Sequence, residues 1–145
     1  MGDSVSFEQS PAGQNLGGAK WEMRFYEDIL KRNPDYVEVL MLLGNLYTGR
    51  KMYAQGLQVD QRLATLKKDD PIVHYNLACS HSLLKQVGDA FRALSKAVEL
   101  GYRDVEHMEK DSDLDNVRSD PRYAEAVRKM RPPARRSSPE PRPES

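Results

Sequence analysis

The chain lacks several features on which other classes of protein depend. It has 145 residues, a single cysteine, and 22 basic against 22 acidic side chains. One cysteine, Cys79, excludes an intramolecular disulfide and fits a reducing compartment. A formal net charge of zero gives no whole-chain indication of nucleic-acid or membrane binding.

Long apolar runs and secretion signals are missing too. The longest apolar run, Val39 to Leu43, is far shorter than the roughly 20 residues that cross a bilayer. No basic segment followed by an apolar run opens the chain, so it does not resemble a secretion signal. We therefore expect a soluble, cytoplasmic protein without a membrane partner.

Common catalytic motifs are also absent. The sequence contains no glycine-rich phosphate loop, HExxH, GxSxG or CxxC. Cys79 would need a neighbouring base to act as a nucleophile, and residues one helical turn away, such as Tyr75 and Ser82, are not bases. We predict that the chain is not an enzyme, that it has no cofactor and no small-molecule substrate, and that Cys79 is inert.

Two groups of residues suggest metal binding but lack the pattern for it. Aspartates alternate over 111–115, as in an EF-hand loop, but Asn116 and Arg122 stand where that loop needs glycine and glutamate. His74 and His81 would lie roughly 10 Å apart along one helix, too far to share an ion. We predict no metal site, a solvated acidic turn and two packing histidines.

The clearest positive feature is an internal repeat. Shifting the chain by 34 residues places apolar residues on apolar ones and small residues on small ones at nearly every matched position. The pairs are Leu40 with His74, Leu43-Gly44 with Leu77-Ala78, Tyr47 with His81, Tyr53 with Val87, Gly56 with Ala90, Leu57 with Phe91, Leu63 with Ala97, and Leu66 with Leu100. Large apolar residues recur every three or four positions, as a helix requires. Such a period is typical of proteins built from stacked units.

This pattern resembles the tetratricopeptide repeat (TPR), a helix-turn-helix unit of 34 residues. The second copy carries Tyr75-Asn76-Leu77-Ala78, then Ala90, Leu94, Ala97 and Leu100. The first copy departs from the family at Gly56, where alanine is usual, and at Asp60, where an aromatic residue or leucine is expected. The resemblance implies an all-α, short TPR-type helical solenoid of antiparallel helix pairs, about six helices in all.

Composition and capping signals divide the chain. We expect a disordered arm at 1–20, which is rich in glycine, and a disordered tail at 131–145, which is rich in proline and arginine. The TPR-like domain at 21–130 would hold a half repeat (21–34), repeats at 37–70 and 71–104, and a closing segment (105–130). The first helix is predicted to begin at Trp21. Helix caps are predicted at Asp35 (a capping box with Glu38), Asp70, Asp104 and Asp120.

The closing segment resembles the one that ends many bacterial TPR arrays. There, an aspartate-leucine-aspartate turn precedes a helix that starts with Asp-Pro-Arg and an aromatic residue, as residues 113–123 do here. The resemblance implies that Leu114, Val117 and Tyr123 cover the open side of the last repeat.

In TPR proteins the first helix of each repeat lines a concave groove. The resemblance implies that the partner-binding groove residues here are Met41, Asn45, Thr48, Tyr75, Asn76 and Cys79, facing away from the interhelical core. In peptide-binding relatives, asparagines resembling Asn45 and Asn76 hydrogen-bond the ligand backbone. Met41 and Tyr75 are the expected anchors. Either the groove is open, or the chain's own segments fill it.

Relatives that bind the carboxylate terminus of cytosolic heat-shock chaperones add lysine and arginine to these asparagines. Here Met41 and Glu106 occupy the two lysine sites, and Lys110 could replace the arginine. We therefore predict a mildly apolar groove that binds a peptide or helix of another protein, as an adaptor, co-chaperone or assembly factor.

Two surfaces provide alternatives. Nucleic acid or an anionic surface could bind the basic cluster of Arg128, Lys129, Arg131, Arg135 and Arg136, with a steep dependence on salt. That cluster has no interleaved aromatic residues. Separately, Trp21 and Phe25 would either form an exposed interface or pack on the first repeat.

Overall fold

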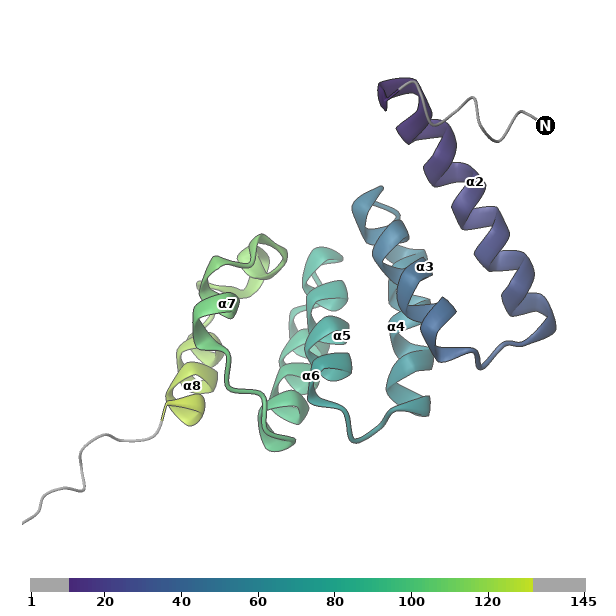
Figure 1. Cartoon of the computed structure of the whole chain (residues 1–145). Coiled ribbons are helices and arrows are strands. Elements are labelled where there is room, and N and C mark those ends of the chain that lie inside the picture. The colour runs from purple at the N-terminus through teal and green to yellow at the C-terminus, as the bar shows by residue number, and fades with distance from the viewer. Residues whose placement is uncertain (1–10, 132–145) are drawn as a thin grey trace, which may run out of the picture. The chain divides into compact units, whose positions relative to one another are not determined.

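The computed structural model describes residues 11–131, with side chains from residue 20, and this part of the chain is helical without strands. It contains two compact units, one up to Leu66 and one from Lys67. The first holds α2 (Pro11–Arg32), α3 (Val37–Gly49) and α4 (Tyr53–Leu66). The second holds α5 (Pro71–Leu83), α6 (Val87–Glu99), α7 (Val105–Lys110), the 3₁₀ helix η2 (Ser112–Val117) and α8 (Pro121–Met130) (Figure 1). None of the helices described is both long and apolar enough to span a membrane.

Each predicted repeat is a pair of packed helices, α3 with α4 and α5 with α6. Small residues allow the helices to approach closely. A β-carbon on Gly44 would lie 3.2 Å from Val59 Cγ1, and Ala78, at the matching position of the second pair, is fully buried. His74 and His81 are buried and hydrogen-bonded to the Lys68 carbonyl and the Gln86 side chain, which confirms them as packing residues.

The turns within the two pairs repeat as well. Lys51 and Lys85, 34 residues apart, both adopt a left-handed conformation, with φ of 63° and 61°. In each turn the following amide closes the helix: Met52 N donates to the Tyr47 carbonyl at 2.8 Å, and Gln86 N donates to that of His81 at 2.9 Å. This is the bonding of a helix terminus with a left-handed residue, for which glycine is the usual choice.

The closing segment packs as expected. Leu114, Val117 and Tyr123 are buried in one apolar core with Leu94 and other residues of α5 and α6. The Arg118 guanidinium donates to the Tyr123 hydroxyl at 2.8 Å and to two backbone carbonyls, which connects η2 to α8. The period therefore ends where η2 and α8 cover the second repeat.

The predicted caps at Asp70, Asp104 and Asp120 are confirmed, since each accepts a hydrogen bond from a backbone amide of its helix. The cap at Asp35 is wrong. Tyr36 holds the N-cap position of α3 without a side-chain bond, and the Asp35 carboxylate instead pairs with Arg62 of α4. A tertiary ion pair has replaced the local cap.

The first helix begins earlier than predicted. α2 starts at Pro11 and not at Trp21, because proline suits the first position of a helix and the glycines that follow weaken a helix without ending it. Residues 1–10 and 132–145, in the arm and tail expected from composition, lie outside the described residues.

Candidate functional site

The first helix of the second repeat lines a hollow of about 380 Å³, together with the chain that leads into α7. Its walls include Ile72, Tyr75 and Asn76 of α5, with Tyr102, Asp104 and His107 opposite. Two of the predicted groove residues, Tyr75 and Asn76, therefore line the same hollow. The volume lies near the lower end of the roughly 300–1,000 Å³ typical of ligand sites, so it suits a few side chains of a partner.

Tyr75 is the floor of this hollow and not an exposed anchor. It is 3% exposed, its ring stacks on Tyr102 with centroids 4.5 Å apart, and its hydroxyl donates to Asp111 Oδ2 at 2.6 Å. The expectation that Tyr75 faces away from the interhelical core is wrong, because Asp111 offers a partly buried acceptor that draws the hydroxyl inward. Burial, together with the neighbouring Cys79 and Asp111, raises the pKa of Tyr75 well above its usual value.

The Asp111 carboxylate contacts several polar side chains beneath the hollow. Its Oδ2 also accepts a hydrogen bond from the Cys79 thiol at 3.7 Å and lies 3.4 Å from His107 Nε2. Cys79 is buried, and burial, with the charge of Asp111 next in importance, raises the pKa of its thiol. The thiol is therefore protonated at neutral pH and packs against the acidic turn.

Cys79, Asp111 and Asp113 place possible metal-ligand atoms within 4.8 Å of one another. Metal ligands must be deprotonated, whereas the Cys79 thiol carries its proton and donates it to Asp111. Burial, followed by repulsion from Asp111, also raises the pKa of Asp113. Asp111 accepts from the Cys79 thiol and from the Asp113 backbone amide, and the absence of a metal site stays a prediction.

Asn76 and Ile72 present the exposed chemistry of the hollow. Ile72 is 51% exposed, and Asn76 is exposed with no hydrogen-bond partner among the described residues. They stand four positions apart on α5, so they are neighbours on one helix face. Asp70 fixes the start of this helix by accepting from Ile72 N at 2.9 Å.

The remaining predicted groove residues lie on α3 in the first unit. Met41 is 44% exposed and Asn45 is exposed, so both can contact a partner. Thr48 is half-buried and faces α4, because a β-carbon on Gly56 would lie 3.2 Å from its Oγ1. Thr48 therefore belongs to the packing between α3 and α4 more than to an open surface.

A second hollow, of about 480 Å³, lies between α6 and α8 and was not predicted from the sequence. Its charged rim is largely occupied within the chain. Arg122 pairs with Asp120 at 2.9 Å and lies 4.8 Å above the Phe91 ring. No local pattern could have indicated this hollow, since it forms only when α8 packs on α6.

The solved structures that resemble this chain include two of MamA. MamA from residue 41 to its end, from Desulfovibrio magneticus RS-1, has a TM-score of 0.60 and 20% identity, covering 86% of this chain and 71% of that one. The MamA RS-1 ArsTM double mutant has the same TM-score and identity over 86% and 70%. No family model and no curated protein matches. At 20% identity the likeness concerns the fold alone, an all-α helical repeat of the TPR type.

Proposed function

We propose that the chain is a non-catalytic interaction module, which binds a peptide segment or helix of a partner protein on the first helices of its repeats. The observation that carries this proposal is the pair Ile72 and Asn76 at the hollow of the second unit. An exposed apolar side chain beside an amide without a partner suits a peptide, since the amide can both donate to and accept from its backbone. The adaptor, co-chaperone and assembly-factor roles are particular forms of this activity.

The rigid floor of the hollow supports this assignment. Tyr75 is held by its stack on Tyr102 and by its bond to Asp111, so the surface is formed before a partner arrives. Preformed sites lose less side-chain entropy on binding. In the first unit, Met41 and Asn45 on α3 provide a second apolar-plus-amide pair, exposed in the same way.

The basic tail is the alternative, and the described part of its cluster does not favour it. Arg128 pairs with Glu125, and Arg131 lies 3.7 Å from Glu109, so two of the cations already have partners. Arg135 and Arg136 lie outside the described residues.

The test is calorimetry with a partner captured from the native cell. Asn76→Ala is expected to weaken binding by about 1 kcal/mol, because peptide hydrogen bonds are lost. Gln58→Ala, which removes an exposed amide from α4, is the matched control and should have no effect. Raising salt from about 50 to 200 mM should change the affinity only modestly, well below the thousandfold loss expected for many phosphate contacts. A steep salt slope, with binding lost on deletion of residues 131–145, would transfer the function to the tail.

A further inference from the structure

α2 has the register of a second repeat helix, but no first helix precedes it among the described residues. The 34-residue shift places Phe25 on Val59 and Ile29 on Leu63, both in α4. Val59 and Leu63 are 8% and 4% exposed on a helix that packs against α3, whereas Phe25 is 46% exposed. The face of α2 that a first helix would cover is therefore open among the described residues.

The chain does not turn back to supply that helix where the repeat would place it. In both complete repeats a lysine at positive φ, Lys51 or Lys85, reverses the chain between the first and second helices. The matching residue is Gly17, which lies inside α2 (Pro11–Arg32). The backbone thus continues as helix through the position of the missing turn.

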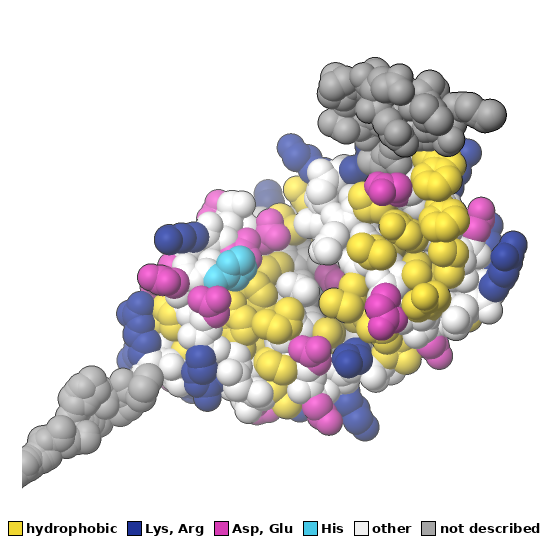
Figure 2. Space-filling model, viewed as in Figure 1, with side chains coloured by type: hydrophobic (Ala, Val, Ile, Leu, Met, Phe, Trp, Pro, Cys, Tyr) yellow, Lys and Arg dark blue, Asp and Glu magenta, His cyan; other side chains and the backbone are white. Residues whose placement is uncertain are grey.

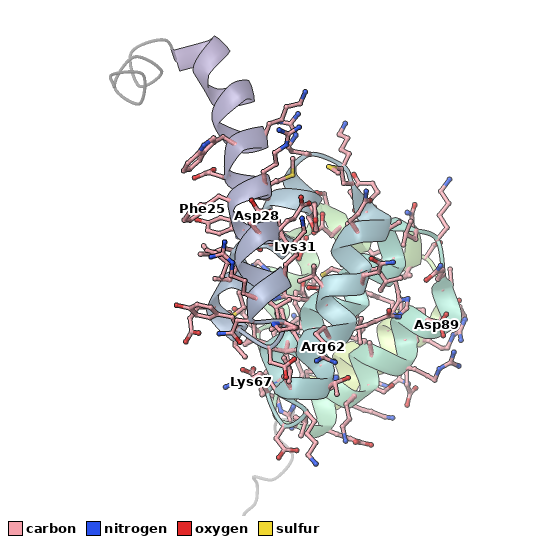
Figure 3. All side chains as sticks on the ribbon, turned by 90° about the vertical axis from the view of Figure 1, so that its right-hand side faces the viewer. Phe25, Asp28, Lys31, Arg62, Lys67 and Asp89 are labelled. Carbon is pink, nitrogen blue, oxygen red and sulfur yellow. The ribbon has the colours of Figure 1, made fainter. Side chains whose placement is uncertain are left out.

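The uncovered face is aromatic and ordered. Trp21 is 60% exposed and stacks on Phe25 with centroids 5.2 Å apart and 8° between the rings. Figure 2 shows hydrophobic side chains gathered over α2 and α3, and Figure 3 shows Phe25 on the side of α2 away from Lys31. α3 contacts α2 elsewhere, since the Tyr47 hydroxyl donates to Glu27. Exposed apolar patches of this kind mark interaction surfaces.

The contacts between α3 and α4 indicate which helix would fit. Gly44 faces Val59, and Val59 is the residue that matches Phe25 after the 34-residue shift. A covering helix therefore needs glycine or alanine opposite the larger phenylalanine ring. Thr48, one turn after Gly44, faces Gly56. The residue of α2 that matches Gly56 is Glu22, an exposed carboxylate without an ion-pair partner among the described residues. A lysine or arginine on the covering helix would neutralise it.

We propose that α2 is completed by an amphipathic α-helix of another protein, which packs antiparallel to α2 on Trp21, Phe25 and Ile29. The recognised helix carries glycine or alanine opposite Phe25 and, four residues later, lysine or arginine opposite Glu22. This surface differs from the hollow beside α5, so the inference stands independently of the proposed function.

The probe is a synthetic peptide of residues 36–50 carrying Thr48→Lys, because its parent helix already packs on a second helix in this way. Trp21 is the only tryptophan of the chain, so a blue shift of its fluorescence emission shows that the bound peptide buries the Trp21 ring. Saturable binding to the full chain is expected, weakened about tenfold or more by Phe25→Ala. Glu22→Lys should reverse the preference, so that a Thr48→Glu peptide binds more tightly than the Thr48→Lys peptide.

Both variants change exposed side chains, and circular dichroism checks that they are folded. Asn76→Ala and the charge reversal Glu99→Lys lie in the second unit and should leave binding unchanged. The proposal is overturned if no saturable binding occurs, or if binding ignores both Phe25→Ala and Glu22→Lys. It is also overturned if sedimentation shows that the chain alone forms a dimer that Phe25→Ala dissociates, since a second copy would then cover α2.

Discussion

Single side chains around Asp111 determine how the second unit combines a rigid interior with an open hollow. One carboxylate oxygen accepts hydrogen bonds from Tyr75 and Cys79 of α5 and lies 3.4 Å from His107 Nε2 of α7. Such hydrogen bonds offset the cost of burying a carboxylate. The same contacts hold the Tyr75 ring against Tyr102. Burial, followed by the charge of Asp104, raises the pKa of Tyr102 to about 12. These tyrosines therefore stay neutral at physiological pH.

Removing the Tyr75 hydroxyl should destabilise the fold. Tyr75→Phe keeps the ring stack but takes a donor from Asp111, and we expect a loss of about 1–3 kcal/mol in the free energy of unfolding, because a bond to a charged group is lost. Urea denaturation measures the change. Tyr36→Phe is the control, since Tyr36 is 42% exposed, and should stay within about 0.5 kcal/mol. Equal effects of the two substitutions would show that the Asp111 bond contributes nothing.

At the scale of the elements, the helix pairs depend on small residues at their crossings. Gly44 and Gly56 in the first pair have Ala78 and Ala90 as their counterparts in the second. All four are buried, and a β-carbon on either glycine would come within 3.2 Å of the facing helix. The distance between paired helices is therefore set by these positions more than by the large apolar residues around them.

Enlarging one crossing residue should strain its pair. Ala90→Leu is expected to cost about 1–3 kcal/mol, because Ala90 is 2% exposed and three added carbons would overpack the core around it. Thermal melts followed by circular dichroism test this, with Ser95→Leu, an exposed position on the same helix, as the control. A neutral Ala90→Leu would mean that the repeat register is misplaced.

At the scale of the whole molecule, the closing segment is what ends the array. Met108 and Leu114 are fully buried, and Val117 is 1% exposed, in the core that α5 and α6 share with α7, η2 and α8. The outer side of α8 is charged, with Arg122, Glu125 and Arg128 exposed. Terminal units of repeat proteins need such a cover, apolar inside and polar outside, to remain in solution.

Removing that cover should expose the second repeat. A chain ending at Arg103 is expected to aggregate and to lose more helix than the deleted residues account for, because Leu94 and its neighbours lose their packing partners. Circular dichroism and light scattering follow both effects. A chain ending at Arg131 is the control and should melt as the full chain does. If the shorter chain instead stays monomeric with its remaining helices intact, η2 and α8 do not have a closing role.

Local residue patterns were enough to predict much of the fold. The caps at Asp70, Asp104 and Asp120 follow from residues within one helical turn. The 34-residue period is visible when the sequence is compared with itself, and it gives His74 and His81 the positions of packed side chains, where they are buried. Neither signal depends on how distant segments pack in space. The all-α repeat fold was therefore determined by the sequence itself.

Tertiary structure decided the features that depend on residues far apart in the chain. Tyr75 has the repeat position of a groove residue. Its hydroxyl nevertheless donates to Asp111, 36 positions later, so that the buried ring forms the floor of the hollow. Asp35 has the spacing of a helix cap, yet its carboxylate pairs with Arg62 of α4. For Tyr75, a hydrogen bond to a charged group, worth about 1.5–3 kcal/mol, outweighs the local preference. The Asp35–Arg62 pair is exposed and worth at most about 1 kcal/mol, which is comparable with the cap that it replaces.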